Sequence, residues 1–173
     1  MQRVLLTGIS GVGKSTVIRE LLARGYHAID ADTDAWSAWT DDVRTPAALG
    51  SPVAPGRDWV WRADRMQHLL ATDDADLLFV SGCAENMGQF YPQFDHIVLL
   101  SAPADVIVER LATRTDNAYG KHPDEVRRIL GQMHTIEPLL RQRADYEINT
   151  SMPLDQVVDA ILHLVRDLAE GMG

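Results

Sequence analysis

The sequence has one cysteine, Cys83, and fewer basic than acidic residues. A lone cysteine excludes a disulfide framework and a cysteine-based zinc site, and it favours a reducing compartment. There are 16 Lys and Arg against 25 Asp and Glu, so the net charge is −9. This charge disfavours sequence-independent binding to nucleic acid, because such binding needs a basic protein surface. No apolar run approaches the ~20 residues that a membrane span requires. A buried-strand pattern begins at Arg3, so we expect no secretory or transit segment.

These absences predict a cytoplasmic protein, monomeric or homodimeric, with neither nucleic acid nor a membrane as a partner. Its length of 173 residues is typical of a single domain. Short apolar runs predict five strands, and helical spacing or helix-start signals predict the helices between and after them. The fold class expected is α/β, a three-layer domain with a mainly parallel five-stranded sheet and helices on both faces. The predicted strands are Val4–Leu6, Tyr26–Ile29, Leu77–Val80, Ile97–Leu100 and Tyr146–Ile148, and the predicted helices are Ser15–Arg24, Trp59–Leu70, one after Ser101-Ala102-Pro103, one from Pro123 and Ser151–Leu168.

Two segments interrupt this regular alternation. Residues Asp41–Arg57 hold several prolines and glycines and read as a loop, long enough to suggest a functional lid rather than a plain connector. A second, polar connector runs from Thr115 to His122 and precedes a helix that Pro138 should kink or break. Strand order cannot be read from one sequence.

The most specific motif follows the first predicted strand and fits G-x-x-x-x-G-K-[ST] at every fixed position. Glycines let such a loop wrap an anion, and the next helix adds the positive end of its dipole. A random chain of this size matches the pattern roughly once in 150 trials. A Rossmann dinucleotide site is disfavoured, because Thr16 stands where a third glycine or alanine is needed. The predicted nucleoside-triphosphate contacts are Gly8, Ser10, Gly11, Val12, Gly13, Lys14, Ser15 and Thr16, with Lys14 at the β- and γ-phosphates and the Ser15 hydroxyl on Mg²⁺.

Three further segments narrow the class. The sequence contains neither the DxxG nor the NKxD motif of GTPases. The run from the glycine-rich loop through Gly25–Asp32 resembles the opening of dephospho-CoA kinases and shikimate kinases, which carry a D-x-D after the second strand. Val98–Pro103, followed by Glu109-Arg110 and Arg114, resembles the strand, helix and RxxxR of adenylate-kinase-like enzymes, and the end of the chain is similar to their last strand and helix. The chain therefore resembles P-loop small-molecule kinases, including bacterial ATP-binding proteins of this group.

The resemblance implies roles for the two carboxylates of the D-x-D. In kinases that phosphorylate a hydroxyl, such groups activate that hydroxyl or hold the metal through water. We therefore expect Asp32 to act as the base and Asp30 to support Mg²⁺ together with Ser15. Side chains beyond the carboxyl end of a strand face the crevice where α/β sheets bind ligands. The structural alternative is that both residues cap the helix that follows.

Basic residues of the second half are expected around the nucleotide. Arg110 and Arg114 lie four residues apart, so they share one helix face. The resemblance implies that Arg110 packs on the adenine and that Arg114 touches phosphate as the lid closes; a solvated helix face is the alternative. Lys121, one of only two lysines, is a candidate lid cation. The predicted domain spans 1–173, with an acceptor-binding insertion at about 33–72 and a lid at about 115–128.

The acceptor region is predicted from aromatic and basic residues around the long loop. All four tryptophans lie between Trp36 and Trp61, among several arginines, and such groups suit a planar or anionic acceptor. A small satellite core under the loop is the alternative for any single tryptophan. Ser81 follows the third predicted strand, at a position where related enzymes place an acidic residue or a glycine-rich acceptor loop. More of the Mg²⁺ coordination would therefore fall on Ser15 and the D-x-D. The candidate acceptor residues are Asp32, Trp36, Arg57, Arg62, Glu85 and Asn86.

Together these features predict ATP- and Mg²⁺-dependent phosphoryl transfer to a small molecule, with Lys14, Asp32 and Arg114 as the catalytic residues. A hydroxyl acceptor (a nucleoside, sugar acid, cofactor alcohol or antibiotic) is the first choice, because a hydroxyl benefits from a base. A nucleoside monophosphate is the alternative. From another class, a nucleotide-binding regulator or sensor with little turnover also fits.

Overall fold

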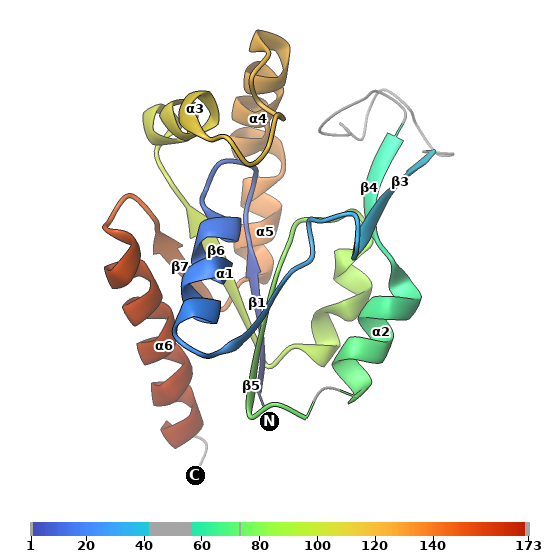
Figure 1. Cartoon of the computed structure of the whole chain (residues 1–173), viewed down its shortest axis with the longest axis vertical. Helices are drawn as coiled ribbons and strands as arrows, with labels where there is room; N and C mark the ends of the chain where they lie inside the picture. The colour runs from blue at the N-terminus through green and yellow to red at the C-terminus, as the bar shows by residue number, and fades with distance from the viewer. Residues whose placement is uncertain (1, 42–56, 73, 172–173) are drawn as a thin grey trace.

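The computed structural model describes residues 2–41, 57–72 and 74–171, and its centre is a sheet in the order β2-β5-β1-β6-β7. Each pair of neighbouring strands is parallel. Helices cover both faces of the sheet, so the predicted three-layer fold is confirmed (Figure 1). The strands are β1 (Gln2–Thr7), β2 (His27–Asp30), β5 (Leu77–Ser81), β6 (His96–Ser101) and β7 (Tyr146–Asn149).

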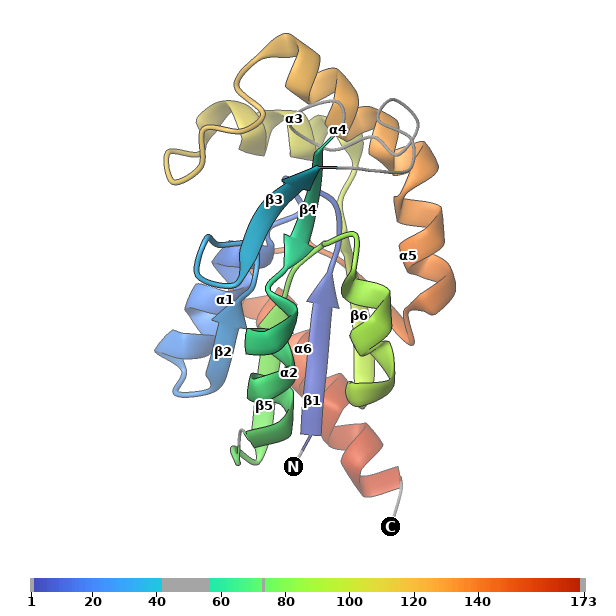
Figure 2. The same ribbon diagram turned by 90° about the vertical axis from the view of Figure 1, so that its right-hand side faces the viewer.

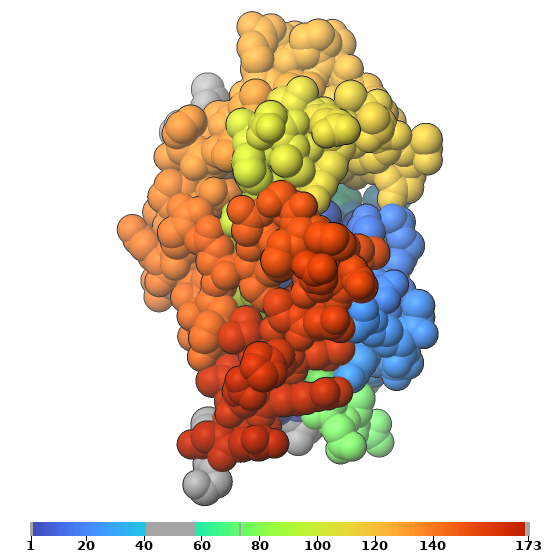
Figure 3. Space-filling model, turned by 90° about the vertical axis from the view of Figure 1, so that its left-hand side faces the viewer, coloured from blue at the N-terminus to red at the C-terminus, as the bar shows by residue number. Residues whose placement is uncertain are grey.

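Alternation along these strands builds two hydrophobic cores. Val4 and Leu6 of β1 face the core that α1 (Lys14–Ala23) and α6 (Leu154–Gly171) cover. Leu5, between them, faces the second core, beneath α2 (Ala63–Thr72) and α5 (Glu137–Arg143). Figure 3 shows the first of these outer layers, with α6 at the centre of the face and α1 beside it. Burial on both faces explains why the strands read as continuous apolar runs.

The carboxyl ends of the strands share one edge, and the elements outside the sheet gather there. Helices α3 (Ala104–Thr113) and α4 (Pro123–Thr135) lie above this edge, as does a hairpin of β3 (Ser37–Asp41) and β4 (Arg57–Trp61) (Figure 2). The 3₁₀ helix η1 (Met87–Gln93) packs beside α2. Helix α4 ends at Thr135 and α5 begins at Glu137, so the break predicted near Pro138 is confirmed.

The hairpin corrects two predictions. A helix was expected from Trp59, and a loop from Asp41 to Arg57, but Arg57–Trp61 is a strand that pairs antiparallel with Ser37–Asp41. The physical reason is that aromatic side chains favour a pleated, half-buried surface, and Trp39 stands directly opposite Trp59. The rest of the predicted loop, 42–56, lies outside the described residues. Among the described helices, none is long and apolar enough to cross a bilayer.

An ion-pair network ties α5 to the edge of the sheet. Arg141 donates to Glu147 on β7 over 2.6 Å and to Glu137 over 3.0 Å. Glu147 also accepts from the Ser101 hydroxyl on β6. The Glu137 side chain is only 7% exposed, so without Arg141 its carboxylate would be buried with too few partners.

Arg141→Met should therefore lower the free energy of unfolding by about 1–3 kcal/mol at neutral pH. Hydrogen bonds from Arg141 and Ser101 hold the pKa of Glu147 below its ordinary value of 4.5. A lowered folded-state pKa gives stability that is present above the ordinary pKa and lost as the pH falls through the folded-state value. In urea unfolding, the deficit of the variant should thus be smaller at about pH 3 than at pH 7.

Arg127→Met is the matched control, because Arg127 pairs with Asp124 on the exposed face of α4. Its effect should be within about 0.5 kcal/mol. An Arg141→Met deficit of equal size at both pH values would assign the effect to lost packing of the arginine stem instead.

Candidate active site

The glycine-rich loop connects β1 to α1 and is shaped by close backbone contacts. Gly11 and Gly13 have φ angles of +88° and +100°, a region that side chains rarely adopt. A Cβ on Gly8 would lie 2.5 Å from the carbonyl oxygen of Leu100 on β6, so this position has no room for a side chain. The loop thus turns tightly over the sheet edge and leaves the first N–H groups of α1 open to an anion.

Lys14 and Asp32 form a charged pair beside this loop. The Lys14 ammonium donates to the carbonyls of Gly8 (2.6 Å) and Ile9 (3.0 Å) and lies 3.8 Å from a carboxylate oxygen of Asp32. Asp32 also accepts from the backbone N–H of Cys83 over 3.1 Å. Burial raises the pKa of Asp32, an effect that the Lys14 charge and the Cys83 N–H oppose. A carboxylate with a raised proton affinity is suited to accept a proton.

A second acid, Asp30, lies beside Asp32 and accepts a hydrogen bond from the backbone N–H of that residue over 3.1 Å. Asp30 accepts a 2.6 Å hydrogen bond from the Ser15 hydroxyl, and its other oxygen is 3.5 Å from the Ser81 hydroxyl. In the register of β2 with β5, Asp30 is paired directly with Ser81. The carboxylate expected at the end of β5 is therefore supplied from the neighbouring strand. Hydroxyl and carboxylate oxygens are ligands that Mg²⁺ prefers, so Ser15 and Asp30 suit this ion.

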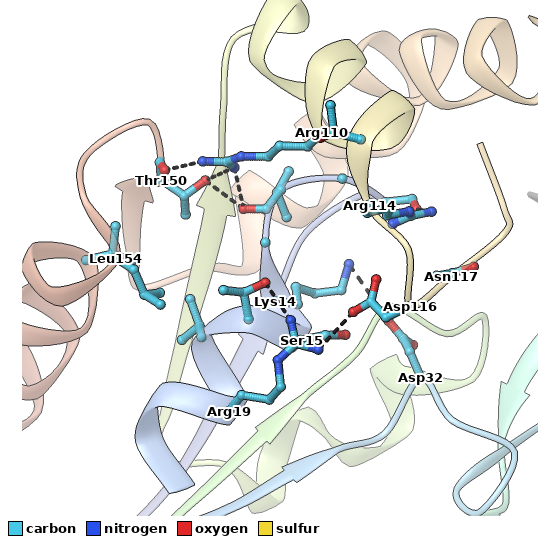
Figure 4. A pocket seen from close by; sticks show the side chains of 18 of the residues that line it. Lys14, Ser15, Arg19, Asp32, Arg110, Arg114, Asp116, Asn117, Thr150 and Leu154 are labelled. Atoms are coloured by element: carbon cyan, nitrogen blue, oxygen red, sulfur yellow. Dashed lines mark hydrogen bonds and ion pairs between the residues drawn. The ribbon is translucent and has the colours of Figure 1, made fainter. Parts of the chain in front are cut away.

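One cavity, of about 640 Å³, lies between α1, α3 and the start of α6. Figure 4 shows Arg110 and Arg114 entering it from α3, with Lys14 and Ser15 at the glycine-rich loop. Arg110 is held by three hydrogen bonds, to the hydroxyl and carbonyl of Thr150 and to the Val12 carbonyl. Arg114 lies 3.5 Å from the Ser10 hydroxyl and also donates to the Tyr119 carbonyl. The cavity thus joins an anion-binding loop to two guanidinium groups.

A second cavity, of about 710 Å³, lies between the β3–β4 hairpin, the segment after β5, and α5. Trp39 and Trp59 line it from the hairpin, and Glu85 and Cys83 line it from the segment after β5. Burial raises the pKa of the Cys83 thiol to about 11, so it stays protonated near neutral pH, in keeping with a packing role. The two cavities share four lining residues: Ser10, Lys14, Asp32 and Asn117.

Lys121 lines neither of these two cavities. Its ammonium donates to the carbonyls of Ala112 and Arg114, at the end of α3. Those carbonyls have no partner within the helix, so the cation is used to cap it. Arg110 and Arg114, by contrast, both line the first cavity, and their contacts with adenine and phosphate stay predictions.

Of the predicted acceptor residues, Asp32 and Glu85 line the second cavity, whereas three others point elsewhere. Trp36 packs under the guanidinium of Arg65, beside α2. Arg62 donates to the Asp34 carbonyl. Asn86 uses its amide to donate to and accept from the backbone of Trp61, because the end of β4 has no further strand to pair with there. The side chain of Arg57 lies outside the described part of the chain.

Several lining residues were missed by the sequence analysis. Thr150 holds Arg110 in place, and its signal in the sequence was its position two residues after the last predicted strand. Trp39 and Trp59 belonged to the tryptophan cluster but were not singled out. Arg143, at the end of α5, reaches the second cavity without any signal in the sequence.

Comparisons with known proteins agree with this geometry. The sequence profile of a family described as an AAA domain matches residues 4–131. The chain is 27% identical over 175 residues to shikimate kinase 2 of Yersinia enterocolitica. The aligned region covers 96% of this chain and 97% of that protein.

Solved structures support the fold. A shikimate kinase from Acinetobacter baumannii, in complex with shikimate, superimposes with a TM-score of 0.61 at 18% identity, covering 96% of this chain and 94% of that one. A gluconokinase from Sinorhizobium meliloti gives a TM-score of 0.60 at 22% identity, covering 99% of this chain and 95% of that one. At these identities the similarity establishes the fold. The acceptor has to be inferred from the chemistry of the cavity.

Thr150→Val should weaken ATP binding by about tenfold, because it removes the hydroxyl that Arg110 and the Val12 carbonyl share while keeping the side-chain shape. Titration calorimetry with ATP and Mg²⁺ measures the change. Thr135→Val is the matched control, since Thr135 bonds only within α4 and lines neither cavity. Equal affinities for the two variants would show that the orientation of Arg110 does not matter for the nucleotide.

Proposed function

Because the chain belongs to the AAA-domain family and is a P-loop small-molecule kinase, we propose that it transfers the γ-phosphoryl group of ATP, with Mg²⁺, to a hydroxyl group. The observation that carries this proposal is the wall shared by the two cavities. Lys14 and Asp32, 3.8 Å apart, border both of them. A phosphoryl donor in the first cavity and an alcohol in the second would therefore meet beside the Lys14 cation and the Asp32 carboxylate, which would act as the base.

The glycine-rich loop and the first turn of α1 would bind the phosphates of ATP through backbone N–H groups. Lys14 would donate to the β- and γ-phosphates in place of the loop carbonyls that it now contacts. Arg110, which Thr150 holds in place, would pack on the adenine of ATP. Arg114 would contact its phosphates. These roles assign the first cavity to the nucleotide.

Mg²⁺ fits the oxygen pair formed by the Ser15 hydroxyl and the Asp30 carboxylate. When bound, the ion supplies charge neutralisation for the phosphate oxygens. The chain's own residues provide the remaining requirements: two cations for the transferred group, and a carboxylate for the proton of the acceptor.

In the transfer step, the acceptor oxygen forms a bond to the γ-phosphorus as the bond between that phosphorus and the β–γ bridging oxygen breaks. The hydroxyl proton moves to Asp32, and ADP leaves. Asp32 is held for this task by the Cys83 N–H and by the indole N–H of Trp59, at 3.1 and 3.4 Å. Both donors orient the carboxylate, so less conformational freedom has to be lost before it is positioned to accept the proton.

Asp32→Asn should lower the rate of phosphoryl transfer by about 10²- to 10⁴-fold while ATP affinity stays within about threefold, because the amide cannot take the proton but keeps the size of the side chain. Transfer of labelled γ-phosphate into a metabolite extract measures the rate, and calorimetry measures ATP binding. Asp34→Asn is the matched control: Asp34 is exposed, two residues away and outside both cavities.

Retention of the wild-type rate by Asp32→Asn would contradict a hydroxyl acceptor. It would favour a nucleoside monophosphate, whose phosphate is already ionised. ATP binding by the wild type without any labelled product would instead support a nucleotide-binding regulator.

A further inference from the structure

We propose that the acceptor is an uncharged alcohol with a flat, largely apolar face, a sugar or aromatic ring, that stacks on the indoles of Trp39 and Trp59. The inference rests on the proposed phosphoryl transfer and adds to it the chemical class of the acceptor. It is carried by the aromatic wall of the second cavity and by the charges of its lining.

The aromatic wall is the inward side of the β3–β4 hairpin. Trp39 and Trp59 are direct partners across the two strands, with ring centroids 4.8 Å apart and planes tilted by 49°. On the same side of β4, two residues further along, Trp61 is 1% exposed and packs in the core. The hairpin is therefore anchored by one indole and presents two others to the cavity, which suits it to hold a flat ring.

This wall is in direct contact with the proposed base. The indole N–H of Trp59 donates to Asp32 over 3.4 Å, so the ring is fixed with its edge at the carboxylate. An acceptor ring stacked beside it has its hydroxyl groups next to Asp32. The facing side of the cavity is lined by apolar and aromatic side chains: Met87, Tyr91, Ile136, Leu139 and Leu140.

The charges of the described lining balance. Apart from Lys14 and Asp32, the cavity is bordered by one basic residue, Arg143, and one acidic residue, Glu85, among the residues that the structure describes. An acidic acceptor would enter beside two carboxylates, Asp32 and Glu85, and would find one guanidinium, that of Arg143, because Lys14 is assigned to the phosphates. Recognition of a carboxylate or phosphate group usually relies on a fork of several such donors.

Two of the arginines that the sequence places near this region, Arg62 and Arg65, are used elsewhere, and the side chain of Arg57 lies outside the described residues. Arg62 donates to the Asp34 carbonyl over 3.0 Å, and Arg65 donates to the Ala35 carbonyl over 2.5 Å while covering Trp36. Both guanidinium groups thus brace the turn before β3. The described cavity favours stacking and hydrogen bonding over anion binding.

The first test determines the charge of the acceptor without knowing its identity. The protein is incubated with labelled ATP, Mg²⁺ and a neutral-pH metabolite extract, and Lys14→Ala serves as the blank. The labelled product is isolated and treated with phosphatase, and the released acceptor is passed over an anion exchanger. We expect it to elute unretained.

A released acceptor that the anion exchanger retains would overturn the inference and leave the kinase activity standing. The absence of any labelled product, from protein that binds ATP, would overturn the proposed function, and the inference would fall with it. The two failures are thus distinguished by whether a product forms.

The second test uses the acceptor so identified. Trp39→Ala should raise its KM by about tenfold or more, with kcat and the KM for ATP within about threefold, because stacking holds the acceptor in the ground state and the transition state alike. Trp39→Phe keeps a flat ring and should recover most of the loss. An unchanged acceptor KM in Trp39→Ala would overturn the stacking, and unchanged ATP binding in both variants verifies that they fold.

Discussion

The parallel pairing of β2, β5 and β1 is the constraint on which the site depends. It brings three loops to one edge of the sheet: the glycine-rich loop after β1, the D-x-D after β2 and the segment after β5. The pairing of Asp30 with Ser81 then sets the carboxylate beside Ser15 at a distance of 2.6 Å. Because adjacent parallel strands end at nearly the same height, the Asp30 carboxylate lies beside the end of β5, which carries Ser81.

A second consequence of this arrangement is electrostatic. Lys14 is buried among loop carbonyls, and Asp32 is partly buried beside the hairpin, so each would be costly without the other. Their separation of 3.8 Å is long for a direct hydrogen bond, which leaves both groups able to take new partners. The Lys14 ammonium and the Asp32 carboxylate are thus close enough to stabilise each other, and far enough apart for each to bind a new partner.

The parts of the site that the sequence predicted are those with a local cause. Lys14 and Ser15 follow a strand with a continuous apolar run, and Asp30 stands at the end of a second, weaker strand, so their positions are determined by the strand ends. Trp39 and Trp59 were not assigned to a wall, because the strands that pair them are separated by a long segment and carry no strict alternation of polar and apolar residues.

A polar side chain that the sequence suggests for a binding site can instead form hydrogen bonds with backbone groups of the folded chain. Lys121 caps α3 and Asn86 closes the end of β4, and neither outcome is visible in the sequence, since both depend on which carbonyls lack partners in the folded chain. Thr150 illustrates the reverse case. This small polar residue after the last strand holds Arg110 at the wall of the first cavity, and only the tertiary contact reveals it.

The shared wall between the cavities has a thermodynamic consequence. Lys14 and Asp32 border both sites, so a ligand that draws Lys14 away from Asp32 changes the charge that the other ligand meets. Coupling of this kind is reciprocal: whatever factor one ligand contributes to the affinity of the second, the second contributes to the first. Under the proposed function, the nucleotide and the acceptor would therefore form a heterotropic pair, with the contact between Lys14 and Asp32 as the element that links them.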